Sequence, residues 1–125
     1  MAITFQHFEG KGRGVVACRD FRAGELIERA PVIPIPADEL SLLQQTRLGS
    51  YYFEWGNDCR QGAIALGHSS LYNHSYEPNA RYETREAEDV IEIFALREIR
   101  AGEEITINYN NLHESAHQPL SFAVK

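Results

Sequence analysis

Short apolar stretches dominate this 125-residue sequence, and glycines, prolines or charged residues interrupt them every few positions. Interruptions at this spacing are typical of many short strands joined by turns. The sequence therefore predicts a mostly β fold with one or two short helices. A chain of this length can bury roughly two-thirds of its unfolded surface around one core, so residues 1–125 are expected to form a single domain.

The clearest predicted strand runs from Val90 to Leu96. Alternate apolar residues share one face of this segment, whereas Glu92 falls on the other face. We expect the strand to pair with residues 81–84 across an exposed hairpin tip that contains the charged residues 85–89.

A short helix is predicted after Pro36. Asp38 or Ser41 can cap its N-terminus, and Gly49 can end it. Isolated helices of this length are unstable in water, so we expect apolar residues such as Leu40 to pack the helix onto the sheet.

Two segments of the chain resemble each other: residues 17–27 read ACRDFRAGELI, and residues 95–105 read ALREIRAGEEI. Gly24 and Gly102 can supply the positive φ that a tight turn requires. Two copies are too few for a repeat protein, so we expect two similar β-hairpins, one near each end of the domain.

Charge and apolar patterning limit the partners. The formal net charge is −6, which disfavours electrostatic capture of nucleic acid and favours a basic protein partner. No apolar run approaches the roughly 20 residues that cross a bilayer, and the N-terminus lacks the apolar stretch of a secretory signal. These features predict a cytoplasmic protein that binds neither a membrane nor nucleic acid directly.

Metal binding is not expected either. Cys18 and Cys59 are too few and too scattered for a zinc site or a disulfide framework, so we expect both to be reduced and structural. His68 and His74 have no second ligand at a recognised spacing.

Three segments carry the functional signal. They are Gly-Arg-Gly at 12–14, before the first expected strand, Asn-His-Ser-Tyr-Glu-Pro-Asn at 73–79, and Gly-Glu-Glu-Ile-Thr-Ile-Asn-Tyr at 102–109. Their order and spacing over about residues 10–109 resemble the SET domain family of protein lysine methyltransferases. The small size is similar to that of the stand-alone SET proteins of viruses and bacteria. The resemblance implies a β-clip-like fold of several short sheets, with a knot-like threading of the C-terminal segment.

The resemblance also implies an activity, the transfer of a methyl group from S-adenosylmethionine to the side-chain amine of a protein lysine, with S-adenosylhomocysteine as the product. Lys11 or Arg13 would meet the carboxylate of the cofactor, although each is equally well explained as a solvated surface charge. The cofactor-binding residues implied by the resemblance are Lys11, Gly12, Arg13, Gly14, Asn73, His74 and Tyr109.

Tyrosines are implied to line the lysine channel. In the family the residue matching Tyr109 faces the methyl-transfer channel, and Tyr82 matches another tyrosine of the channel wall. Tyr72 is a further candidate. A phenol of pKa about 10 is protonated at neutral pH, so Tyr109 is expected to orient the amine rather than to deprotonate it. Tyr82 is expected to influence how many methyl groups the lysine accepts.

One motif departs from the family. Many SET enzymes have Glu-Tyr-x-Gly where residues 28–31 read Glu-Arg-Ala-Pro, so one channel wall must be built differently. Tyr51 or Tyr52 can supply the missing ring. The zinc-binding flanks of larger SET domains are absent, so the C-terminal tail, residues 110–125, or a second subunit of a homodimer is expected to close the site.

The proposed chemistry requires a neutral lysine nitrogen about 3 to 3.5 Å from the methyl carbon. The positive sulfur of the cofactor and the desolvation of the channel both lower the pKa of the lysine, so no side-chain base is needed. The expected substrate is a basic protein such as a histone, another DNA-packaging protein or a ribosomal protein. A histone substrate would imply a location in the nucleus, either of the protein's own cell or of a host cell. Two alternatives remain: a catalytically inactive SET-like binding or dimerisation module, and a small β-rich domain unrelated to methyl transfer.

Overall fold

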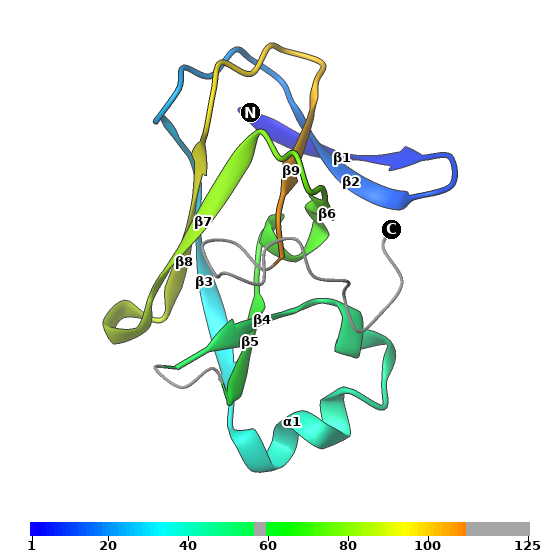
Figure 1. The fold of residues 1–125 in the computed structure, drawn as a ribbon, viewed down its shortest axis with the longest axis vertical. Helices are drawn as coiled ribbons and strands as arrows, with labels where there is room; N and C mark the ends of the chain where they lie inside the picture. The colour runs from blue at the N-terminus through cyan, green and yellow to red at the C-terminus, as the bar shows by residue number, and fades with distance from the viewer. Residues whose placement is uncertain (57–59, 110–125) are drawn as a thin grey trace.

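A computed structural model describes residues 1–56 and 60–109. The described chain forms two sheets, one short α-helix and three short 3-10 helices (Figure 1), which confirms the predicted mostly β fold class. The first sheet consists, in spatial order, of β1 (Ile3–Phe8), β2 (Gly12–Ala17), β9 (Glu104–Ile107) and β6 (Asn73–His74). The second consists of β4 (Tyr52–Trp55), β5 (Gln61–Ala65), β3 (Leu26–Ile35), β8 (Val90–Ala95) and β7 (Ala80–Arg85).

The first sheet joins segments that are far apart in the sequence. Strand β9 lies between β2, with which it is antiparallel, and β6, with which it is parallel. The expectation that residues 12–14 precede the first strand was wrong, because β1 comes before them and they begin β2. Strand β1 was not predicted because its apolar residues do not mark a buried face. It lies at the edge of the sheet, and Phe5 is 55% exposed.

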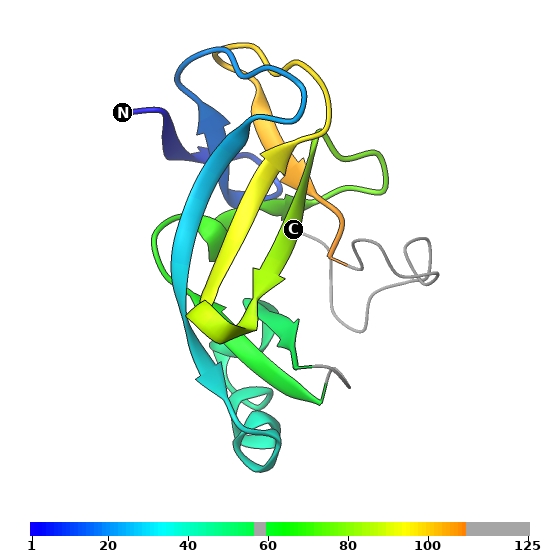
Figure 2. The same cartoon turned by 90° about the vertical axis from the view of Figure 1, so that its left-hand side faces the viewer.

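Strand β3 organises the second sheet. Its ten residues pair with β8 along the N-terminal half and with β5 along the C-terminal half. Figure 2 shows β3, β8 and β7 side by side. The predicted pairing of 90–96 with 81–84 is confirmed, with Ile91 and Ile93 buried on one face. The 3-10 helix η3 (Glu86–Glu88) forms the hairpin tip.

The predicted helix exists but is shorter than expected. Helix α1 (Ala37–Leu43) follows Pro36 directly, so neither Asp38 nor Ser41 is its N-cap, and η1 (Arg47–Ser50) contains Gly49. The fixed φ of Pro36 suits the entry to a helix without a capping side chain. As expected, Leu40 packs on the sheet: a Cβ at Gly62 would lie 2.7 Å from its Cδ1.

The two similar segments do not form separate hairpins, which corrects the sequence-based expectation. The strands on either side of each turn belong to different sheets, and the two segments pair with each other through reciprocal hydrogen bonds. Phe21 and Ile99 exchange both backbone bonds, at 2.7 and 2.9 Å. The backbone N–H of Gly24 donates to the carbonyl of Ala95, and in the same way that of Gly102 donates to the carbonyl of Ala17. Because buried backbone groups need partners, these related turns satisfy each other.

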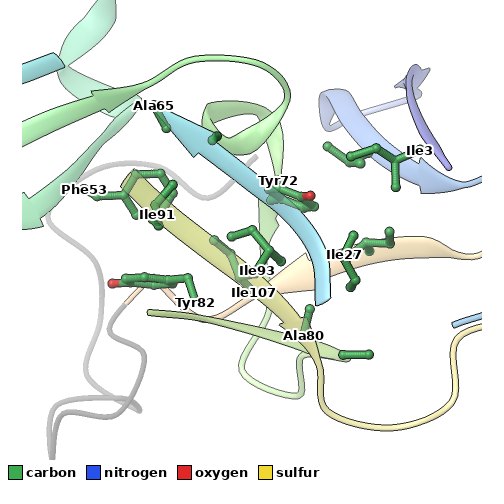
Figure 3. Packing of buried hydrophobic residues seen from close by; sticks show 14 of the residues in the cluster. Ile3, Ile27, Phe53, Ala65, Tyr72, Ala80, Tyr82, Ile91, Ile93 and Ile107 are labelled. Carbon is green, nitrogen blue, oxygen red and sulfur yellow. The ribbon is translucent and has the colours of Figure 1, made fainter. Parts of the chain in front are cut away.

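The core lies where the sheets meet. Figure 3 shows Tyr72 and Tyr82 among the isoleucines of this core. Cys18 is a free and exposed thiol at the end of β2, so the expectation that it is a structural residue was wrong, and Cys59 lies outside the described residues. Within residues 1–56 and 60–109, no helix combines the length and apolarity of a membrane span.

Candidate active site

Asn79 attaches the loop after β6 to strand β9. Its side-chain Nδ2 donates to the carbonyl of Glu104 at 2.8 Å, and its Oδ1 accepts the backbone N–H of Thr106 at 2.8 Å. The amide thus replaces a backbone partner for β9, which is a common use of asparagine in turns. Asn79 is 4% exposed, so the loop is anchored from within the protein.

His74 binds the backbone of Tyr109, two residues after the end of β9. The backbone N–H of Tyr109 donates to Nδ1 of His74 at 3.0 Å, and the ring centroids are 4.9 Å apart. An Nδ1 that accepts a hydrogen bond leaves the proton of the neutral imidazole on Nε2. Burial lowers the pKa of His74 from 6.5, which favours this neutral form. Nε2 is buried and has no hydrogen-bond partner among the described residues.

The phenol of Tyr109 returns to the same loop. Its hydroxyl donates to the carbonyl of Tyr72 at 2.8 Å, immediately before Asn73 in the chain. Burial, and then the neighbouring phenol of Tyr51, raise the pKa of Tyr109 to about 12. The hydroxyl is therefore protonated at neutral pH, and its single hydrogen is held by the Tyr72 carbonyl.

Tyr82 supports Tyr109 from the second sheet. Its hydroxyl donates to the carbonyl of Tyr109 at 3.0 Å, and its ring meets Phe53 edge-on with centroids 4.9 Å apart (Figure 3). The side chain is 6% exposed. A residue from β7 thus holds the chain just after β9.

Tyr72 contributes its backbone rather than its phenol to this cluster. The residue is 1% exposed, and its hydroxyl donates to Oε1 of Glu28 at 3.0 Å. Burial, and then the charge of Glu28, raise the pKa of the Tyr72 phenol well above 10. Glu28 also accepts hydrogen bonds from Ser69 Oγ at 2.8 Å and from the backbone N–H of His68 at 2.9 Å.

The role of Glu28 as an anchor for these three donors was not predicted from the sequence. The sequence did offer one indication. Glu28 is the first residue of segment 28–31, which differs from the Glu-Tyr-x-Gly motif of many SET enzymes but keeps its glutamate. Arg29, which replaces the tyrosine of that motif, is half exposed and forms ion pairs with Glu88 and Glu92 on the outer face of the sheet.

The structure distinguishes the two tyrosines that could replace the missing ring. Tyr51 is half-buried and close enough to influence the ionisation of Tyr109. Tyr52 instead accepts a hydrogen bond from Nε2 of Gln44 at 2.9 Å, at the end of helix α1. Of the two, Tyr51 is the one that joins the Tyr109 cluster.

Residues 11–14 lie against the same loop. Nζ of Lys11 forms an ion pair with Oε1 of Glu104 at 3.0 Å, and Oε2 of Glu104 accepts Nδ2 of Asn73 at 2.7 Å. A Cβ at Gly14 would lie 2.6 Å from Glu104 Oε2 and 2.7 Å from Asn73 Nδ2, so only glycine fits there. Arg13 is exposed. The two predicted cofactor segments therefore meet through Glu104.

The model of the SET domain family matches residues 12–110 of this chain. The chain belongs to the SET domain family. This confirms the resemblance predicted from residues 12–14, 73–79 and 102–109.

Curated relatives of this SET protein are lysine methyltransferases by name. A histone-lysine N-methyltransferase of Schizosaccharomyces pombe, specific for lysine 37 of histone H3, is 36% identical over 87% of this chain and 74% of its own length. The N-lysine methyltransferase KMT5A-A of Xenopus laevis is 31% identical over 91% of this chain. The chain spans about three-quarters of the yeast protein but only 38% of the frog protein.

A solved structure supports the SET fold independently. A crystal structure of a histone methyltransferase candidate from Plasmodium falciparum superposes with a TM-score of 0.65 at 27% identity, covering 89% of this chain and 99% of that one. Within the described ranges of this SET domain, no three His, Cys, Asp or Glu side chains are grouped to hold a metal ion. The predicted closing tail, residues 110–125, lies outside the described residues.

Proposed function

We propose that this chain is a protein-lysine N-methyltransferase that uses S-adenosylmethionine and acts on a basic protein. One observation carries the proposal. The Tyr109 hydroxyl is bonded to the carbonyl of Tyr72 at 2.8 Å, while the Tyr109 backbone is bonded to His74, so a protonated phenol is fixed beside the Asn73–His74 loop. Binding alone would not require a phenol held at both ends.

The residues around this loop fit the cofactor. The missing side chain at Gly14 lets Glu104 and Asn73 pack against the backbone, and the buried Nε2–H of His74, which has no partner among the described residues, can donate to a ligand. The bound cofactor would supply a methyl group on a positively charged sulfur. The residues proposed to hold it are Lys11, Gly12, Arg13, Gly14, Asn73, His74 and Tyr109.

Tyr109 is proposed to orient the substrate amine. Its hydrogen is donated to the Tyr72 carbonyl, so the lone pairs of its oxygen can accept an N–H from the amine. The nitrogen lone pair is then free to point along the line of attack. A phenol with a pKa of about 12 does not act as a base at neutral pH. Desolvation and positive charge nearby instead favour the neutral amine.

The rings of Tyr82 and Tyr51 are proposed to line the lysine channel, to which Tyr72 contributes only its backbone carbonyl. Tyr82 supports the Tyr109 carbonyl, Tyr72 provides the carbonyl acceptor, and Tyr51 stands in for the ring missing from residues 28–31. Residues 1–125 are proposed to act as one domain, with 110–125 or the partner subunit of a homodimer closing the site.

The proposed substrate is a histone or another basic protein. The net charge of −6 favours a basic partner, and the yeast relative is named as a methyltransferase of histone H3. A histone substrate would place the protein in a nucleus, and another basic substrate is compatible with the cytoplasm.

A binding assay followed by a mass measurement tests the proposal. S-adenosylmethionine at about 100 times its Kd should stabilise the protein by about 2.7 kcal/mol, seen as a rise in Tm. A lysine-rich protein such as histone H3 should then gain mass in steps of one methyl group. Stabilisation without mass gain on any basic protein would support the inactive binding module instead, and absence of both would contradict the proposal.

A further inference from the structure

Glu104 connects the two segments that approach the proposed cofactor site from opposite ends of the sequence. One carboxylate oxygen pairs with Nζ of Lys11 at 3.0 Å, and the other accepts Nδ2 of Asn73 at 2.7 Å. The side chain of Glu104 is 15% exposed, whereas that of Lys11 is 46% exposed. The carboxylate therefore has one exposed partner, Lys11, and one buried partner, Asn73.

This contact determines which way the Asn73 amide points. An ionised carboxylate can only accept hydrogen bonds, so the NH₂ group of Asn73 must face Glu104. The amide oxygen then points away from the carboxylate and is an acceptor. Asn73 is 1% exposed, and rotating its amide would bring two acceptors together in a buried place.

Lys11 and Asn73 consequently present complementary groups on either side of one carboxylate. The ammonium of Lys11 suits a ligand carboxylate, whereas the oxygen of Asn73 and the charge of Glu104 suit a ligand ammonium. The missing side chain at Gly14 lets Oε2 of Glu104 and Nδ2 of Asn73 pack directly against the backbone, where a Cβ would lie 2.6 and 2.7 Å from them. An α-amino acid carries this pair of opposite charges on one carbon.

We propose that Glu104 is the positioning residue for the amino-acid end of the cofactor, holding Lys11 and Asn73 in the arrangement that recognises its carboxylate and ammonium. The inference rests on the proposed function, because it concerns the same cofactor. Glu104 was not among the residues that the sequence motifs singled out for this site.

Two ligands that differ only at that end test the inference by calorimetry. S-adenosylhomocysteine has the amino-acid end, and 5′-methylthioadenosine lacks it. The substitution Glu104→Gln should weaken S-adenosylhomocysteine binding by about tenfold or more, because a buried donor loses its charged acceptor, while 5′-methylthioadenosine changes by less than about twofold. Lys11→Met, at an exposed side chain that does not threaten folding, should show the same selectivity.

A matched control and a coupling test sharpen the result. Glu103→Gln alters the adjacent carboxylate, which pairs with Arg97 at the surface, and should leave both affinities unchanged. The double variant of Lys11 and Glu104 should lose less than the product of the single losses, because the two residues act as one unit. Equal weakening of both ligands by Glu104→Gln, or no weakening, would overturn the inference. Failure of the unmodified protein to bind either ligand would instead contradict the proposed function.

Discussion

The backbone N–H of Tyr109 donates to Nδ1 of His74 at 3.0 Å, so the imidazole of one motif holds the main chain of another. The contact requires His74 to be neutral, because a protonated Nδ1 is itself a donor. The strength of this hydrogen bond therefore depends on pH, and so does the position of Tyr109 in the site.

Acid should weaken this contact and destabilise the fold. Burial lowers the pKa of His74 from 6.5, so near and below that pH the unfolded chain binds more protons than the folded one. The contribution of His74 is fully present above pH 6.5 and is lost as pH falls through the lower pKa of the folded state. His74→Asn keeps an acceptor near Nδ1 but does not titrate, so its Tm should fall less between pH 7 and 5. Parallel Tm profiles of the two proteins would contradict this assignment.

Tyr109→Phe should reduce kcat by about 100-fold, because the amine loses the group that orients it. Binding of S-adenosylhomocysteine, measured by calorimetry, should remain. Because the pKa of Tyr109 is raised to about 12, the rate of the unmodified enzyme should rise with the deprotonation of the substrate lysine and show no decline from Tyr109 up to pH 10. Full activity of the Phe variant would exclude the orienting role.

Tyr82→Phe should change the number of methyl groups added per lysine. The substitution removes the hydroxyl that donates to the carbonyl of Tyr109 at 3.0 Å and leaves the ring in contact with Phe53. The distribution of mono-, di- and trimethylated peptide is read by mass spectrometry. Tyr52→Phe, which removes a hydroxyl bonded to Gln44, is the matched control and should leave the distribution unchanged.

Gly14→Ala should abolish the stabilisation by cofactor. The new Cβ would lie 2.6 Å from Glu104 Oε2 and 2.7 Å from Asn73 Nδ2, so both side chains must shift, at a cost of about 1–3 kcal/mol in stability. Gly10→Ala is the control. Its Cβ would meet no described atom within 4 Å, but its φ of +79° costs about 1–2 kcal/mol. Only the first variant should lose the rise in Tm on adding S-adenosylhomocysteine.

Glu28→Ala should lower the free energy of unfolding by about 2–4 kcal/mol, because the hydroxyls of Ser69 and Tyr72 and one backbone N–H lose their acceptor. Arg29→Ala, at the next position, removes only surface ion pairs and should cost less than about 1 kcal/mol. Urea unfolding of both variants measures the difference. Equal losses would show that Glu28 is not an internal anchor.

Several features followed from local sequence alone. The strand at 90–95 was predictable because alternation of apolar residues is written in consecutive positions, and it pairs with β7 as expected. The assembly of Asn73, His74 and Tyr109 was predictable through the family motifs. The position of helix α1 was predicted correctly, but its predicted C-terminal end was too late. The helix ends at Leu43 and a separate 3-10 helix follows at Arg47–Ser50, because tertiary packing overrides local helix propensity there.

The mostly β class, the SET family and the segments of the candidate site could be predicted from the sequence, because turn residues, alternation and motif spacing act over a few neighbouring positions. Three further features depend on how the chain packs: the two similar segments pair with each other, the carbonyl of Tyr72 accepts the hydroxyl of Tyr109, and Glu104 joins Lys11 to Asn73. Those contacts link positions tens of residues apart, and which of many chemically suitable partners meet is set by how the sheets cross.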